Sequence, residues 1–171
     1  MGNRKRQAGF TLVEILIVVV ILGILAAIVI PQFTQASESA KASSLSSQLQ
    51  TIRSQIELYQ IEHNGTYPDL TGTNPWEQLT QATTVSGDVE ATGDFGPYLQ
   101  QPPRNSFNNA TAVAIDDSNS PPEHTASNDV GWVYNSTTGQ IRAVLPANVT
   151  PADLGLSEED VTGGDGNTEP Q

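Results

Sequence analysis

A single carboxylate interrupts the most apolar stretch of the chain. Glu14 lies within the run from Phe10 to Ile30, which is otherwise uncharged, and Arg4-Lys5-Arg6 comes just before this run. A charge inside a segment of membrane length costs several kcal/mol unless it meets a partner. We therefore expect Glu14 to pair with a positive group. The positive-inside rule predicts that the basic leader stays cytoplasmic and that the acidic remainder of the chain lies outside the membrane.

The run from Phe10 to Ile30 must position this carboxylate, and it has the length of a membrane span. About 20 apolar residues in a helix cross the ~30 Å hydrocarbon core of a bilayer. A buried core helix is the alternative, but the rest of the sequence is not apolar enough to surround one. A secretory signal peptide would carry its small-residue cleavage site after the apolar run. Here the small residue, Gly9, precedes the run, so a cut between Gly9 and Phe10 would keep the helix.

The segment Gly9-Phe10-Thr11-Leu12-Val13-Glu14, with the apolar run to Ile30-Pro31, resembles the processing signature of type IV pilins and pseudopilins. The resemblance covers roughly residues 4–35. It implies that prepilin peptidase cleaves between Gly9 and Phe10, that Phe10 is N-methylated, and that the subunit polymerises. In the fibre, Glu14 of one subunit would neutralise the Phe10 amine of a neighbour. The alternative for Glu14 is a carboxylate that reaches the membrane interface near the helix start.

The composition excludes several classes of function. The 171 residues carry 19 acidic and 7 basic side chains, a formal net charge of -12. Such a surface repels nucleic acid, so we expect no nucleic-acid partner. The chain has no cysteine, which excludes disulfides and thiolate metal sites. It also has no phosphate-binding glycine loop, nucleophile elbow or His-Glu metal helix, so we expect no enzymatic activity.

The helix is expected to continue well beyond the membrane span, from about Thr11 to Glu62. Pro31 can kink or locally melt it, and the family resemblance implies a flexible joint there. Five apolar residues then recur at alternating spacings of four and three, which places them on one face as a core stripe: Leu45, Leu49, Ile52, Ile56 and Tyr59. Asn64-Gly65 provides the stop. Asn74 is predicted to cap a short helix that runs from Pro75 to about Ala82.

The predicted fold is α+β, a pilin fold in which the long helix packs against about three antiparallel strands. The strands are predicted at 112–115, 130–134 and 140–145, with a hairpin over 135–139. The predicted organisation is a leader (1–9), a transmembrane helix (10–30), its amphipathic extension (31–64), a small globular domain (65–145) and a flexible acidic tail (146–171).

An acidic loop is the one candidate for a metal. Residues 116–129 contain Asp116, Asp117 and Asp129 among serines and asparagines, and oxygen-rich loops of this kind bind Ca²⁺. Major pseudopilins of type II secretion systems carry a calcium site in this region, although their characteristic loop is not reproduced here and Pro121-Pro122 interrupts it. The alternative is a solvated acidic loop. The expectation is no cofactor, with Ca²⁺ as the single exception to test.

Two classes of function compete. The resemblance implies a fibre subunit, either the major pseudopilin of a type II secretion system or a type IV pilin of a surface filament for adhesion, motility or DNA uptake. Its partners would be its own copies, prepilin peptidase and the assembly platform of the bacterial inner membrane. Gly96-Pro97-Tyr98-Leu99 resembles a segment of the major pseudopilin, and many true pilins have a C-terminal disulfide that this chain lacks. The other class, a membrane-anchored extracytoplasmic binding module, would need a convergent polar site that the sequence does not show.

Overall fold

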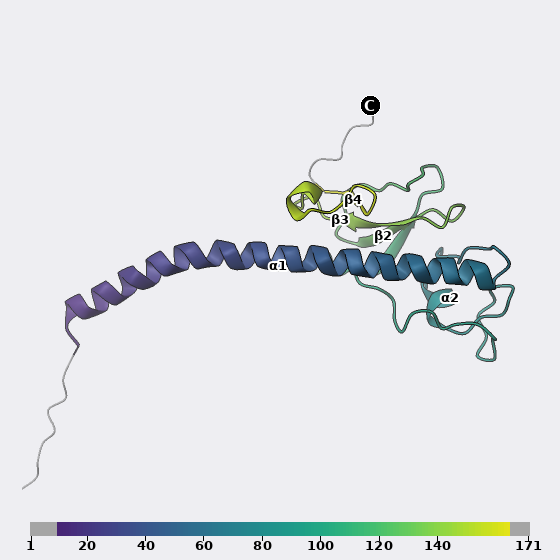
Figure 1. Cartoon of the computed structure of the whole chain (residues 1–171), viewed down its shortest axis with the longest axis horizontal. Helices are drawn as coiled ribbons and strands as arrows, with labels where there is room; N and C mark the ends of the chain where they lie inside the picture. The colour runs from purple at the N-terminus through teal and green to yellow at the C-terminus, as the bar shows by residue number, and fades with distance from the viewer. Residues whose placement is uncertain (1–9, 165–171) are drawn as a thin grey trace, which may run out of the picture. The chain divides into compact units, whose positions relative to one another are not determined.

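One long helix and a four-stranded sheet make up the fold (Figure 1). The computed structural model describes residues 10–164. The elements in chain order are α1 (Leu12–Glu62), α2 (Glu77–Thr80), β1 (Ala112–Ile115), β2 (Val130–Tyr134), β3 (Ile141–Leu145), the 3-10 helix η1 (Pro151–Leu154) and β4 (Val161–Gly163). The chain divides into two units, Met1–Glu38 and Ser39–Gln171, so α1 contributes to both.

Helix α1 confirms the predicted helix and continues through Pro31. Toward its C-terminal end a single face of the helix is buried, and this face contains the whole predicted stripe, with Ala42 added at its start. The helix stops where Asn64 and Gly65 take φ angles of 56° and 87°, the left-handed conformation that ends helices. The N–H of Gly65 donates to the carbonyl of Gln60 at 2.8 Å, which satisfies one of the last free carbonyls.

The sheet corrects the predicted strand number and pairing. The order is β1-β2-β3-β4, with β2 and β3 antiparallel and both outer pairs parallel. The hairpin over 135–139 is confirmed, because the N–H of Asn135 donates to the carbonyl of Gln140 at 2.9 Å. The prediction assumed that successive strands run antiparallel. However, a connection as long as 116–129 can carry the chain back to the other end of the sheet, which allows a parallel pair.

The predicted flexible tail is wrong up to Gly164, because η1 and β4 lie in this stretch and β4 completes the sheet. Residues 165–171 lie outside the described residues. The acidic stretch before β4 is held by two arginines. Arg53 of α1 forms an ion pair with Asp160 at 2.6 Å, and the buried Arg142 of β3 donates to the carbonyls of Glu158 and Val161. A sequence rich in acids and glycine is ordered because cations from two other elements bind it.

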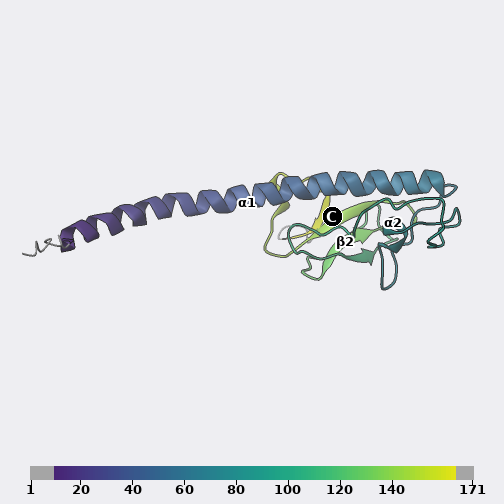
Figure 2. The same ribbon diagram turned by 90° about the horizontal axis from the view of Figure 1, so that it is seen from below.

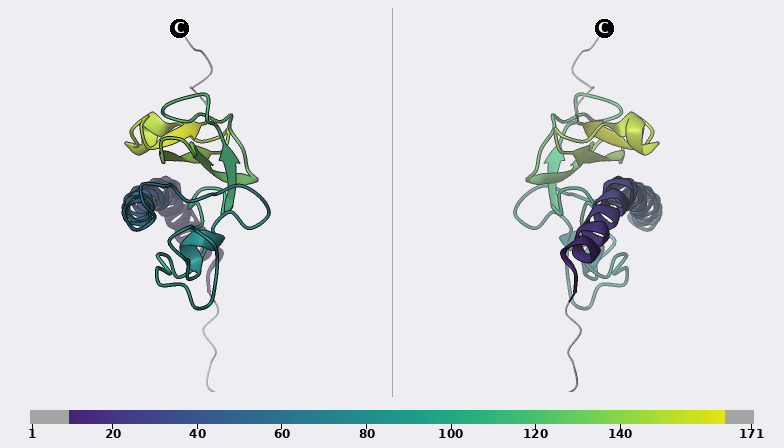
Figure 3. Two further views of the ribbon diagram at one scale, coloured as in Figure 1. Left: turned by 90° about the vertical axis from the view of Figure 1, so that its right-hand side faces the viewer. Right: turned by 90° about the vertical axis from the view of Figure 1, so that its left-hand side faces the viewer.

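The predicted helix at 75–82 is shorter than expected. Helix α2 has four residues, Trp76 occupies the cap position, and no side chain caps it. Figure 2 shows α2 and β2 beside the C-terminal half of α1, and Figure 3 shows this half end-on, with the sheet and α2 on different sides of it. The core between them contains the stripe, Leu79 of α2 and Trp132 of β2. Trp76 meets Trp132 edge to face with ring centroids 6.3 Å apart.

Candidate functional site

At the start of α1, Thr11 and Glu14 are joined by three reciprocal hydrogen bonds. The backbone N–H and the hydroxyl of Thr11 both donate to Glu14 Oε2 at 3.3 Å, and the N–H of Glu14 donates to Thr11 Oγ1 at 3.2 Å. This is the capping box, in which the cap residue and the third helical residue satisfy each other's backbone donors. The carboxylate also lies at the helix end where the dipole favours negative charge.

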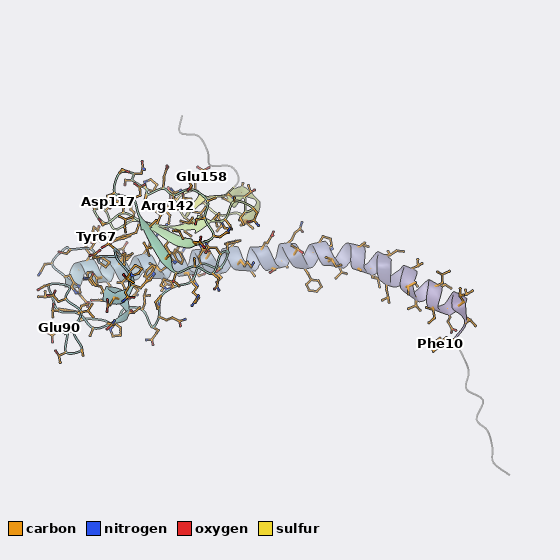
Figure 4. All side chains as sticks on the ribbon, turned by 180° about the vertical axis from the view of Figure 1, so that it is seen from behind. Phe10, Tyr67, Glu90, Asp117, Arg142 and Glu158 are labelled. Atoms are coloured by element: carbon orange, nitrogen blue, oxygen red, sulfur yellow. The ribbon has the colours of Figure 1, made fainter. Side chains whose placement is uncertain are left out.

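Thr11 is a site residue that the sequence analysis missed. The Thr-x-x-Glu pattern before an apolar run is itself a signal for a helix start and could have identified it. Phe10, labelled at the beginning of α1 in Figure 4, is 80% exposed. Gly9 lies outside the described residues, so the structure does not describe the predicted cleavage junction as a whole.

The side chains that follow form an exposed apolar segment, Phe10–Phe33. Its Phe, Leu, Ile and Val side chains are between 40% and 82% exposed, and they point to every side of the helix. By length and composition α1 could cross a membrane, and no part of its most apolar window is buried in the protein. An apolar surface of this extent marks a site that contacts a membrane or other protein chains.

The predicted calcium ligands are not gathered into one site. Asp116 and Asp117 follow β1 directly, whereas Asp129 lies at the far end of the loop, next to β2. Among residues 10–164, no group of three or more His, Cys, Asp and Glu side chains is placed to hold a metal ion. The carboxylates of Asp116 and Asp117 accept hydrogen bonds from neighbouring backbone and side-chain groups instead. The structure therefore does not bring the three predicted ligands together, and calcium binding stays a prediction.

The Gly96-Pro97-Tyr98-Leu99 segment closes the core beside α2. The N–H groups of Tyr98 and Leu99 both donate to the carbonyl of Leu79, at 2.9 and 2.8 Å, and both side chains pack against the core. The Tyr98 hydroxyl donates to Glu62 at 2.5 Å, near the end of α1. Burial, followed by this hydrogen bond, raises the pKa of Tyr98 well above its usual value. The segment thus fixes α2 and the end of α1 to each other.

Both histidines have structural surroundings. His63 is buried, its Nδ1 donates to the carbonyl of Tyr59 at 2.8 Å, and its Nε2 lies 3.0 Å from the hydroxyl of Thr83. Its ring stacks on that of Tyr59 with centroids 3.7 Å apart. His124 is in the acidic loop, where its backbone N–H donates to the hydroxyl of Thr162. Both imidazoles thus make hydrogen bonds within the domain, and that of His124 donates from Nδ1 to the carbonyl of Thr125 at 2.7 Å.

Comparison with known proteins identifies relatives for most of the chain. A family described as the prokaryotic N-terminal methylation motif matches residues 4–30. The type II secretion system core protein G of Pseudomonas aeruginosa is 43% identical over 66 residues, which are 39% of this chain and 46% of that protein.

Two further relatives with the same name align over longer stretches. The protein of Klebsiella michiganensis is 37% identical over 105 residues, 60% of this chain and 69% of the relative. That of Aeromonas hydrophila is 30% identical over 107 residues, 63% of this chain and 72% of the relative. The match to the Pseudomonas protein covers about half of that relative's length. No solved structure matches the chain.

Proposed function

The chain belongs to the type II secretion system core protein G family, and on this premise we propose that it is the major pseudopilin of such a system. It is a structural subunit that polymerises through its N-terminal helix after prepilin peptidase cuts between Gly9 and Phe10 and Phe10 is methylated. Before assembly the subunit lies in the bacterial inner membrane with its acidic domain outside. After assembly it forms a fibre that acts in the export of proteins.

The observation that carries this proposal is the exposed apolar segment at the start of α1. Within the described residues nothing covers Phe10–Phe33, since each of its large apolar side chains is at least 40% exposed. Burying an apolar side chain gains about 1.5–3 kcal/mol, so a row of them is stable only in lipid or against other helices. Lipid covers the segment in the free subunit, and the same segments of neighbouring copies cover it in the fibre.

The charge of Glu14 sets the register in which the helices of neighbouring copies pack. Among residues 10–164 of the single subunit, the Glu14 carboxylate accepts hydrogen bonds from Thr11 alone, at 3.3 Å. The free amine that cleavage creates at Phe10 is a stronger partner, because a charge-assisted hydrogen bond is about twice as strong as a neutral one. Each charge is costly in a dry helix bundle unless the two meet. Glu14 therefore exchanges Thr11 for the Phe10 amine of a neighbouring copy as the subunit docks.

A strain that lacks the chain tests the function. The culture-medium proteins and the surface filaments of this strain are compared with those of its parent. We expect a defined set of exported proteins to disappear from the medium while surface filaments remain. Loss of filaments with unchanged export would overturn the proposal in favour of a surface pilus. No change in either would contradict the role of a major subunit, and would favour an anchored binding module.

The role of Glu14 is tested by complementing the same strain. Glu14→Ala should restore neither export nor cross-linked polymers, although the protein should reach wild-type amounts in the membrane. Glu38→Ala is the matched control, because Glu38 is an exposed carboxylate of the same helix. It should restore both. Normal polymers of Glu14→Ala would remove the pairing argument while leaving the family assignment in place.

A further inference from the structure

The loop between β1 and β2, residues 116–129, is ordered without secondary structure of its own. Connections of this length that form no helix or strand are uncommon in compact domains and need specific contacts to be held in place. The parallel pairing of β1 with β2 makes the loop span the sheet from one end of the strands to the other. Its order therefore has to come from side chains or from a bound ion.

Asp116 organises the beginning of this loop. Its Oδ1 accepts from the N–H of Ser118 at 3.1 Å and from the Ser118 hydroxyl at 2.5 Å. Its Oδ2 accepts from the side-chain amide of Asn119 at 2.8 Å and from the N–H of Glu123 at 2.8 Å. An ionised carboxylate has about four lone-pair sites, so these four donors use the whole capacity of the group.

The next side chains fasten the loop to the β2–β3 hairpin. Asp117 Oδ1 accepts from the N–H of Ser136 at 2.7 Å and from its hydroxyl at 2.9 Å. In return, the side-chain amide of Asn135 donates to the carbonyl of Asn119 at 2.9 Å. Figure 4 labels Asp117 of the loop and Arg142 of β3, the second strand of this hairpin.

The remainder of the loop is held by β3 and β4. Arg142 Nη1 donates to the carbonyl of Pro122 at 3.0 Å. The hydroxyl of Thr162 donates to the carbonyl of His124 at 2.9 Å and accepts from its N–H at 3.1 Å. The loop is therefore tied to three other segments along its length, and each tie uses a side chain that the chain supplies itself.

We propose that this loop is a metal-independent lock, in which Asp116 takes the organising position that a divalent cation holds in oxygen-rich loops. A calcium ion needs about 6–8 oxygen ligands, and the carboxylate oxygens of Asp116 are already engaged by N–H and O–H donors. These hydrogen bonds, that of the Ser118 hydroxyl first, lower the pKa of the Asp116 carboxyl group well below its usual value, so they outweigh the cost of desolvating the charge. This inference concerns the folding of the domain and does not depend on the proposed export function.

Thermal unfolding of the full chain in detergent tests the lock. The melting temperature is measured by tryptophan fluorescence with calcium chloride and with a chelator, because both Trp76 and Trp132 are buried. We expect the same melting temperature in both conditions. A saturable rise with calcium chloride would overturn the proposal.

Variants separate the lock from a cation site. Asp116→Asn places an amide donor against two N–H donors, so the melting temperature should fall by about 5 °C, with and without calcium. Asp129→Asn is the matched control, because within residues 10–164 the Asp129 carboxylate accepts no hydrogen bond, and it should leave the melting temperature unchanged. A fall in melting temperature that appears only in the presence of calcium, in either variant, would overturn the proposal. So would an Asp116→Asn protein with an unchanged melting temperature.

If Asp116→Asn does not fold, Ser118→Ala removes a single donor and should give a smaller fall in melting temperature that calcium does not reverse.

Discussion

The two halves of α1 carry the same kinds of apolar side chain and use them in opposite ways. In the exposed apolar segment, Phe10–Phe33, these side chains are at least 40% exposed, whereas the stripe from Leu45 to Tyr59 is at most 1% exposed. The difference comes from the pattern of the sequence. Apolar residues occupy every side of the helix in the N-terminal half. In the C-terminal half most of them lie on a single face, with Leu58 and Ile61 as exposed exceptions, and only this pattern can be covered by a single small domain.

The same difference separates the carboxylates of two larger regions, the exposed apolar segment and the domain to which the C-terminal half of α1 belongs. Among the residues that the structure describes, Glu14 is held by one residue through hydrogen bonds of 3.3 Å, whereas Asp116 is held by four donors from three residues at 2.5 to 3.1 Å. A weakly held charge is free to change its partner, and a saturated one is not. The first region is therefore prepared for contact with other molecules, and the second is complete in itself.

A pair of leucine substitutions tests this comparison with the largest expected effect. Leu49 is fully buried in the stripe, so Leu49→Ala should lower the free energy of unfolding of the domain by about 2–5 kcal/mol. Leu22 is 58% exposed in the apolar segment, so Leu22→Ala should leave this free energy unchanged. Urea unfolding of the full chain in detergent, followed by tryptophan fluorescence, measures both. Equal losses in the two variants would mean that the two halves of α1 unfold as one unit.

The domain should also include the acidic stretch 158–160, which precedes β4. Arg142 is 4% exposed and donates to the carbonyls of Pro122, Glu158 and Val161. Arg142→Met keeps much of the side-chain volume but leaves these carbonyls without their donor, so the free energy of unfolding should fall by about 1–3 kcal/mol.

Arg104→Met is the matched control for this substitution. Arg104 is exposed and, among residues 10–164, its side chain makes one hydrogen bond, to the carbonyl of Asn109 at 3.2 Å, so its replacement should change the free energy of unfolding little. The same urea titration measures both variants. Limited proteolysis after residue 150 should become faster only for Arg142→Met, and an equal rate in both would show that Arg142 does not hold the stretch.

Much of this division between the two regions could be predicted from the sequence. The apolar run, the stripe of α1 and the hairpin over 135–139 each follow from a strong local pattern, and the structure confirms them. The stop at Asn64-Gly65 also follows from local chemistry, because these residues adopt the left-handed conformation readily.

The missed features depend on contacts between distant segments of the chain. Strand β4 has three residues, too few for a periodic signal, and it forms because Arg53 and Arg142 hold the acidic residues before it. The parallel direction of β1 is set by the path of a loop, which no local pattern encodes. For the candidate site, Glu14 stood out because it is the one charge in an apolar run, whereas Thr11 did not, since threonine is common at ordinary helix starts.

The smallest expected effect concerns Thr11, the only side chain that holds Glu14 in the single subunit as far as residues 10–164 show. Thr11→Ala removes the hydroxyl of the capping box, which should cost about 1 kcal/mol and be confined to the first turn of α1. Amide hydrogen exchange in detergent should therefore become roughly fivefold faster at Glu14, whose N–H donates to this hydroxyl, because 1.4 kcal/mol corresponds to about tenfold. Thr11→Ser keeps the hydroxyl and should exchange at the wild-type rate. Unchanged exchange in Thr11→Ala would mean that Glu14 already has another partner in the free subunit, and the contrast with Asp116 would then be lost.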